Sequence, residues 1–163
     1  MSMAFAAPAP EGYSPCGYMT ARAYREVAVP PYAEVAGASL GSCDIAQLCA
    51  DLDNVMIDCH EPGWDGYGAE AVSVEAYDLA KRFIKSLPPR VPHPTLSADP
   101  DGCVTFEWQE SPRRLVLVSV HPDYRIDYAA RFGDAKDCDY GTKPFFDKLP
   151  TGLCDLVRRV FQT

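Results

Sequence analysis

Three residues in the first half of the chain have side chains that could act together in chemistry. His60, Glu61 and Asp65 fall within six consecutive positions. An imidazole beside two carboxylates is suited to general acid–base catalysis or to binding a metal ion. The spacing H-E-x-x-x-D differs, however, from the H-E-x-x-H pattern that places two zinc-binding histidines on one helical face. A small hydrolase that uses His60, Glu61 and Asp65 is therefore one alternative prediction.

The remaining residues of this kind do not complete a site. His93 and His121 each precede a proline in a predicted loop, so neither is an evident third zinc ligand. The acid pairs Asp99/Asp101 and Asp137/Asp139 resemble weak cation sites, but turn formation explains the first pair and solvation the second. Cys103 or Cys138 could pair with a histidine in thiol catalysis, but no pattern favours this reaction. The sequence therefore predicts no catalytic residue, no metal site and no cofactor.

The glycine-rich turn around Asp65 also has a structural interpretation. Three glycines within residues 63–68 allow positive φ angles and a close approach of neighbouring segments. Trp64 is expected to pack on the core, and Asp65 is expected to accept hydrogen bonds from amides of the turn. Tyr67 adds an aromatic ring with a polar tip. We therefore expect the turn to be mainly a folding element.

Charge is distributed unevenly along the chain. The net charge is −8, and residues 39–78 contain nine acidic residues but no lysine or arginine. They are Asp44, Asp51, Asp53, Asp58, Glu61, Asp65, Glu70, Glu75 and Asp78. Nucleic acids and anionic membranes are bound through clustered lysine and arginine, whereas an acidic surface attracts a basic protein. The expected partner is therefore a protein with a basic surface, with no direct contact to nucleic acid or membrane.

The predicted interaction site lies on a helix and on the turn after it. The aspartates at positions 44, 51 and 58 are spaced by sevens, so they line one flank of the helix. The turn adds two more carboxylates and two aromatic side chains that could anchor a partner. The predicted interaction residues are Asp44, Asp51, Asp58, Glu61, Trp64, Asp65 and Tyr67. A solvated face without a partner explains the same charge and is the alternative.

Periodicity predicts the elements that position these residues. Apolar side chains recur at helical steps over residues 45–59, with Ser42 as the N-cap, and again over residues 74–87, with Ser73 as the N-cap. A last helix opens at Pro150. Between the second and the last helix the period of apolar residues changes to two, which indicates strands at residues 103–109, 115–120 and 125–130. Residues 95–98 are predicted to add an edge strand, and residues 133–143 are predicted to form a loop.

The order of these elements predicts the fold class. Helices and strands that are segregated along the chain form an α+β two-layer domain. We expect two N-terminal helices, an antiparallel meander of three to four strands and a C-terminal helix. Residues 1–38 are predicted to be a proline- and alanine-rich extension, and residues 39–163 a single domain. A homodimer is compatible with the sequence.

Cysteine usage and hydropathy indicate the compartment. The seven cysteines are an odd number without a C-x-x-C pair, which favours reduced thiols over a disulfide framework. No stretch approaches the roughly 18 apolar residues of a spanning helix, and the first ten residues lack the basic region of a signal peptide. A cytoplasmic, soluble protein is expected.

The assembled pattern resembles that of a group of small, uncharacterised bacterial proteins. These share a W-D-G-Y-G-A turn between two helices, followed by D-G-x-x-x-x-E-W and alternating strands. The matching elements here are residues 64–69, Leu87-Pro88, Asp101-Gly102 with Glu107-Trp108, and residues 115–128. The resemblance covers about residues 42–130. It implies a bacterial origin and a shared fold, and it supplies no activity.

The leading hypothesis is a non-enzymatic protein–protein interaction factor. It would be an accessory or inhibitor protein of a bacterial mobile element or anti-defence system. In the extreme case, its acidic surface would mimic the charge of DNA. Besides the hydrolase, a second alternative is a small-molecule-binding domain that uses the sheet face around Phe106, Trp108 and Tyr128.

Overall fold

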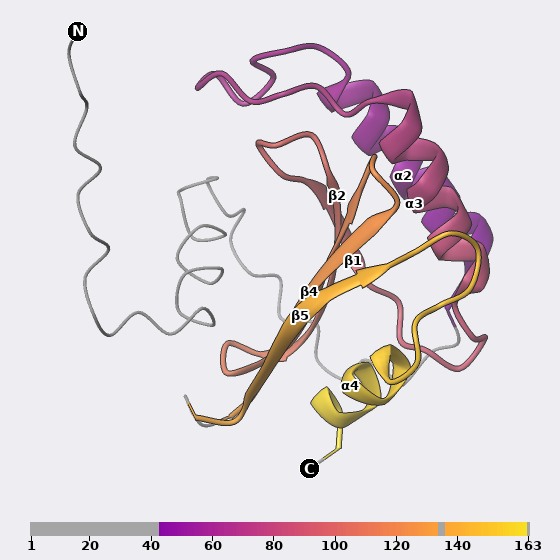
Figure 1. The fold of residues 1–163 in the computed structure, drawn as a ribbon, viewed down its shortest axis with the longest axis vertical. Helices are drawn as coiled ribbons and strands as arrows, with labels where there is room; N and C mark the ends of the chain where they lie inside the picture. The colour runs from indigo at the N-terminus through magenta and orange to yellow at the C-terminus, as the bar shows by residue number, and fades with distance from the viewer. Residues whose placement is uncertain (1–42, 134–135, 163) are drawn as a thin grey trace, which may run out of the picture.

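The helices and strands form two layers. The computed structural model describes residues 43–133 and 136–162, and the extension predicted for residues 1–38 lies outside them. In the part described, three helices lie on one side of a five-stranded sheet (Figure 1): α2 (Ile45–Cys59), α3 (Val74–Ser86) and α4 (Leu153–Val160). The predicted α+β class, with two helices before the strands and one after them, is confirmed.

The sheet is an antiparallel meander in which each strand pairs with the next one along the chain. Its strands are β1 (Thr95–Ala98), β2 (Val104–Ser111), β3 (Arg114–His121), β4 (Arg125–Phe132) and β5 (Cys138–Pro144). The edge strand predicted at residues 95–98 is confirmed as β1. The prediction of three to four strands is one too low, because β5 forms within residues 133–143, which were predicted to be a loop.

Backbone pairing with β4, rather than an apolar pattern, makes β5 a strand. None of its side chains is buried, so the sequence gives no alternation of apolar and polar residues to detect. Gly141 lies opposite Tyr128, and a Cβ atom on this glycine would come within 3.0 Å of the tyrosine hydroxyl. The missing side chain therefore leaves room for the ring of Tyr128 beneath the edge strand.

The caps of the first two helices follow from local sequence. The Asp44 carboxylate accepts hydrogen bonds from the amides of Ala46 and Gln47, at 3.0 and 3.3 Å, and so caps α2. The cap predicted at Ser42 is wrong by two positions, because aspartate is an equally good acceptor. Ser73 caps α3 as predicted. Within the described residues, no helix is long and apolar enough to cross a membrane.

Aromatic rings form the contact between helices and sheet. Phe83 of α3 packs against Phe106 of β2 at 4.7 Å between ring centroids, and against Phe145 at 5.6 Å. These rings are at most 1% exposed, and burying one contributes roughly 2–3 kcal/mol. Trp108 is also buried, and its Nε1 donates to the carbonyl of Pro92 at 2.7 Å. The core thus lies between the helices and one face of the sheet.

Arg114 of β3 holds the end of α4. Its guanidinium donates to the carbonyls of Val160, Arg159 and Gln162 at 2.5–2.9 Å. Carbonyls at a helix C-terminus lack intrahelical partners, and a positive charge there also interacts favourably with the helix dipole. A cation from the sheet therefore fixes the helix in place.

A glycine contact joins the helical half of the chain to the sheet. Gly102, in the turn between β1 and β2, has φ +77°, and a Cβ atom there would lie 2.7 Å from the carbonyl oxygen of Ala71. Next to it, the amide of Glu70 donates to the carbonyl of Pro100 at 2.8 Å. The segment after the W-D-G-Y-G-A turn is thus held against the β1–β2 turn.

Replacing this glycine should weaken the fold. We expect Gly102→Ala to lower the free energy of unfolding by about 2–4 kcal/mol, since it combines left-handed backbone strain with a backbone clash. Gly66→Ala is the matched control, because Gly66 has φ +76° but no neighbouring atom within 4 Å of the position that a Cβ atom would take. Urea unfolding should show a loss of about 1–2 kcal/mol for the control. Equal losses in both variants would contradict the contact.

Candidate functional site

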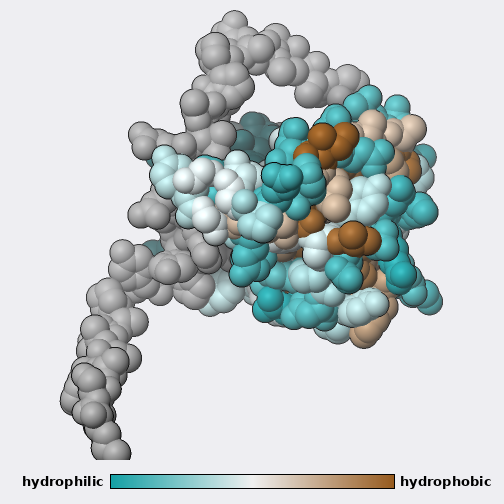
Figure 2. All heavy atoms as spheres, turned by 90° about the horizontal axis from the view of Figure 1, so that it is seen from above, coloured by the Kyte–Doolittle hydropathy of each residue, from teal (hydrophilic) through white to brown (hydrophobic). Residues whose placement is uncertain are grey.

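The predicted interaction residues lie along α2, from its N-cap, and on the turn after it. The nine carboxylates from Asp44 to Asp78, called here the acidic surface, are exposed except for Asp51 and Asp65, which are partly buried. Seen from above, the described part of the surface is largely hydrophilic, with a few separate hydrophobic areas (Figure 2). The stretch without basic residues therefore presents its charge to solvent.

Asp44 and Asp51 also stabilise the fold. Asp44 caps α2, as described above. Asp51 accepts a hydrogen bond from Gln47 at 2.9 Å and lies 3.2 Å from Nε2 of His93, which joins α2 to the connector before β1. A helix cap contributes about 1 kcal/mol, so changing Asp44 alters stability as well as charge.

Asp58 and Glu61 differ from these two. Both are exposed, and Glu61 has a single ionic contact, 3.7 Å from Nε2 of the exposed His60. An ion pair between such exposed groups contributes about 0–1 kcal/mol. Asp58 and Glu61 can therefore be changed with little effect on the fold.

Asp65 and Trp64 build the turn, as predicted. One oxygen of Asp65 accepts hydrogen bonds from the amides of Tyr67 and Ala69, at 2.8 and 3.0 Å. The bonds from the amides of Ala69 and Tyr67 lower the pKa of Asp65 below its ordinary value. Trp64 packs against the core, and its Nε1 donates to the carbonyl of Glu70 at 3.0 Å.

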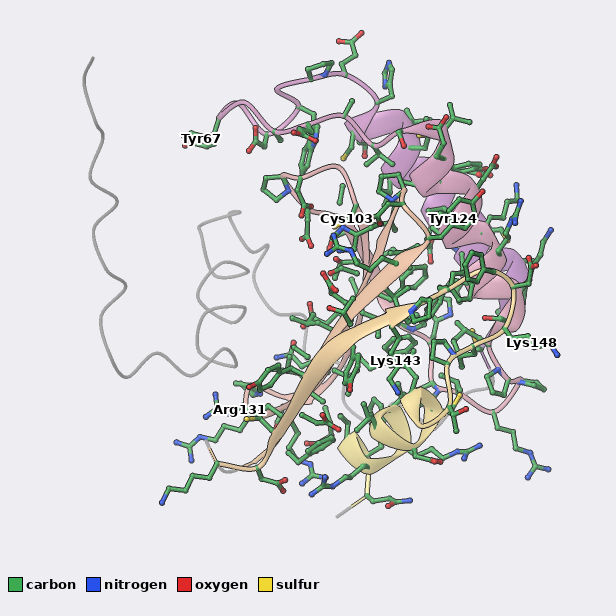
Figure 3. All side chains as sticks on the ribbon, viewed as in Figure 1. Tyr67, Cys103, Tyr124, Arg131, Lys143 and Lys148 are labelled. Carbon is green, nitrogen blue, oxygen red and sulfur yellow. The ribbon has the colours of Figure 1, made fainter. Side chains whose placement is uncertain are left out.

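The side chain of Tyr67, unlike those of Trp64 and Asp65, has no structural role in the turn. Its side chain is 94% exposed and extends from the tip of the turn, away from the body of the molecule (Figure 3). A tyrosine that buries so little area contributes almost nothing to the fold, and this leaves its ring available for contact with another molecule.

The three residues of the hydrolase alternative have separate contacts. Nδ1 of His60 lies 2.7 Å from the carbonyl of Ile57, and its other nitrogen faces Glu61. The Asp65 carboxylate is directed at amides of its own turn. Among the contacts of the described residues, none joins Asp65 to His60.

The small-molecule alternative falls on the core face of the sheet. Phe106 and Trp108 are 0% and 1% exposed, and Tyr128 packs against the same core. A ligand bound there would have to displace α3 or α4 from the sheet.

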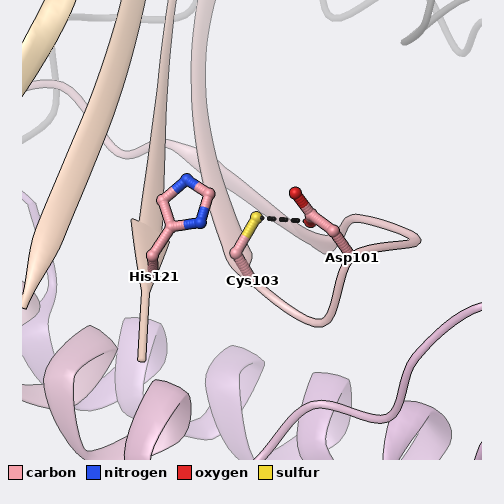
Figure 4. Close-up of side chains that lie close together, drawn as sticks. All are labelled: Asp101, Cys103 and His121. Atoms are coloured by element: carbon pink, nitrogen blue, oxygen red, sulfur yellow. Dashed lines mark hydrogen bonds between the residues drawn. The ribbon is translucent and has the colours of Figure 1, made fainter. Parts of the chain in front are cut away.

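A second cluster lies on the opposite face of the sheet, where the register aligns polar side chains in two rows. His121 pairs with Arg125, and the register that pairs Val104 with Val120 brings Cys103 beside His121. The adjoining row contains Thr105, Ser119, Asp127 and Thr142 as successive cross-strand neighbours. In Figure 4 the His121 ring lies beside the Cys103 thiol, with Asp101 on the other side of the sulfur.

Hydrogen bonds connect the two rows to the β1–β2 turn. The Cys103 thiol donates to Oδ1 of Asp101 at 2.9 Å and lies 3.6 Å from Oδ2 of Asp99. That Asp99 oxygen also accepts from Thr105 at 2.7 Å. Nε2 of His121 lies 3.1 Å from Oδ2 of Asp127.

The surroundings of Cys103 disfavour a thiolate. Its side chain is 1% exposed, and burial, followed by the hydrogen bond to Asp101 and the charge of Asp99, strongly raises the pKa of the thiol. Burial also raises the pKa of Asp101, but bonds from Cys103 and the nearby His121 outweigh it, so the pKa of Asp101 is lowered. Reactive cysteines have the opposite environment, exposed and electropositive.

Sequence reasoning missed this cluster because it placed His121 in a loop. His121 is instead the last residue of β3 and is 9% exposed. Strand parity was the signal: Cys103 and Thr105 alternate with Val104, while Ser119 and His121 alternate with Val120. The nearly continuous apolar run of β3 concealed this alternation.

One further stretch has a spacing known from catalysis. Residues 37–41 read G-A-S-L-G, the spacing of a serine nucleophile turn, and lie outside the described residues. Such a turn follows a strand of an α/β-hydrolase sheet, whereas every strand pair in the described residues is antiparallel.

Comparison with known proteins adds no assignment, since no protein-family model, curated protein or solved structure matches the chain.

The turn should depend on the charge of Asp65. Because the pKa of Asp65 is lower in the folded than in the unfolded chain, its contribution to stability is present above about pH 4 and is lost as pH falls through the folded-state pKa. We expect Asp65→Ala to be less stable than the wild type at pH 7, with a difference that shrinks in acid. Urea unfolding between pH 7 and pH 3 measures it. A difference that is constant over this range would contradict the role of the charge.

Cys103 should be a poor nucleophile. Burial and the neighbouring carboxylates keep its thiol protonated, so we expect iodoacetamide at pH 8 to modify Cys103 far more slowly in the folded than in the urea-unfolded chain. Peptide mass spectrometry in the presence of a chelator measures both rates. Faster labelling in the folded chain would instead indicate an activated thiolate.

Proposed function

We propose that the chain is a non-enzymatic interaction protein that binds a basic surface of another protein through its acidic surface. The observation that carries this proposal is the uniform sign of charge on α2, the following turn and the start of α3. No lysine or arginine occurs among residues 39–78, and of the later residues Lys81 approaches Asp53 through the hydroxyl of Tyr77. A field of one sign steers a partner of opposite charge and rejects partners of like charge.

Exposed apolar side chains on the same elements support a docking role. Ile57, Tyr67 and Val74 are 65%, 94% and 62% exposed, and they lie on α2, the turn and the first residue of α3. Burying these side chains against a partner would add to the electrostatic attraction, since aromatic and aliphatic anchors supply most of the energy in many interfaces.

The proposed biological setting is that of an accessory or inhibitor protein in a bacterial cell. An accessory or inhibitor protein that occupies a basic site would act without catalysis, and occupation of a nucleic-acid-binding site would be the extreme case. The W-D-G-Y-G-A resemblance supports a bacterial origin. The described cysteines are all free thiols, which supports action in a reducing cytoplasm.

Reversing two carboxylates that the fold does not use tests the surface. We expect Asp58→Lys with Glu61→Lys to weaken partner binding at least about tenfold, because attraction becomes repulsion at two positions. The wild-type chain serves as bait in lysates of its host, and the affinity of each captured protein for the purified variants is then measured at two salt concentrations. The affinity for the wild type should fall as salt rises.

The control carries the same change of charge elsewhere. Asp123 and Asp147 are exposed and have single weak ion pairs with Arg125 and Arg82, at 3.6 and 3.4 Å. Asp123→Lys with Asp147→Lys should bind the partner as the wild type does. Equal affinities for both double variants would remove the acidic surface from consideration.

A further inference from the structure

We infer that Asp101, Cys103 and His121 bind a zinc ion. Each offers one ligand atom, and these atoms lie within 4.8 Å of one another. Zinc is bound by thiolate, imidazole and carboxylate at about 2.0–2.3 Å, so three such ligands can surround one ion after small side-chain movements. A mixed set of sulfur, nitrogen and oxygen donors favours zinc over magnesium or calcium, which prefer oxygen alone.

Two separate elements supply the ligands. Asp101 and Cys103 come from the β1–β2 turn and the residue before β2, and His121 comes from the end of β3. The β2–β3 register holds Cys103 beside His121, while the Gly102 contact with Ala71 fixes the turn that carries Asp101. The site is thus preorganised by the backbone.

The surroundings of His121 are those of a metal ligand. A metal-binding histidine usually has a carboxylate at its other ring nitrogen, and that carboxylate is usually itself hydrogen-bonded. Oδ2 of Asp127 lies 3.1 Å from Nε2 of His121, and Thr142 donates to Oδ1 of Asp127 at 2.6 Å. Nε2 is buried, and its contact with Asp127 lacks hydrogen-bond geometry, so within the described residues it has no hydrogen-bond partner.

Charge balance also favours a cation. The thiol of Cys103 lies between the carboxylates of Asp101 and Asp99, at 2.9 and 3.6 Å, and a dication would offset both charges. On binding, the thiol proton passes to solvent and the thiolate bonds the metal. Asp99 is held by Thr105 and Ser119, so a water molecule would complete the coordination.

Among the described residues, Arg125 opposes binding at Nδ1. Its Nη2 lies 3.2 Å from Nδ1 of His121. The guanidinium is partly exposed and already contacts Asp123 and Asp127 at 3.6 and 3.7 Å, so it can withdraw toward these carboxylates. Zinc therefore competes with Arg125 for the imidazole.

Metal titration of the full chain without an affinity tag tests the inference. After removal of metals with a chelator under reducing conditions, Co²⁺ should bind with a stoichiometry of one and give a thiolate-to-cobalt charge-transfer band, and Zn²⁺ should displace it. Cys103→Ser should abolish the band, and Cys103→Ser and Asp101→Asn should each weaken zinc binding at least about 100-fold. Asp127→Asn should weaken it about 10–100-fold.

Two further variants distinguish this site from other thiols and from a structural effect. Cys154→Ser removes a partly buried thiol of α4 outside the cluster and should leave binding unchanged. Arg125→Ala should tighten binding several-fold, an effect that a merely structural arginine would not have. Circular dichroism verifies that each variant is folded. Asp101 lies on an exposed turn, so Asp101→Asn still tests the site if another variant fails to fold. Absence of saturable binding at micromolar metal, or equal affinities for Cys103→Ser and the wild type, would overturn the inference.

Discussion

The contact of Gly102 with Ala71 is the constraint on which the arrangement of both candidate sites depends. The carbonyl of Ala71 occupies the space that any other residue at position 102 would need for its side chain. Because the two backbones meet there, the turn after α2 and the turn between β1 and β2 have fixed relative positions. One consequence is that Glu70 can bond Pro100, and another is that Asp101 and Cys103 are held beside the end of β3.

The two faces of the sheet have different physical roles. The face toward the helices is packed with aromatic and β-branched side chains, and its stability comes from apolar burial. The other face carries rows of hydrogen-bonding groups at the end nearest the β1–β2 turn. Buried polar groups cost free energy unless they are paired, and Asp99, Thr105 and Ser119 satisfy one another there. Nε2 of His121, in the adjoining row, has no hydrogen-bond partner among the described residues.

The acidic surface separates into carboxylates that build the fold and carboxylates that do not. Asp44 and Asp65 accept amide hydrogen bonds, so their presence is explained by a helix cap and a turn. Asp58 and Glu61 have no comparable structural use, and their charge remains unneutralised by any lysine or arginine nearby in sequence. Under the proposed function, a basic partner would contact this second group and the exposed ring of Tyr67, which also has no role in folding.

The sequence by itself determined the helices, four of the strands, the fold class and the use of Asp65 and Trp64 in the turn. These follow from residue periodicity and from bonds between residues close in the chain, such as Ser73 with the first turn of α3. Tertiary structure alone decided β5, whose strand form comes from pairing with β4, and the meeting of Asp101, Cys103 and His121. That meeting depends on strand register, in which a shift of one residue would turn His121 to the other face of the sheet. Register is set by contacts between residues far apart in sequence, and no local pattern contains it.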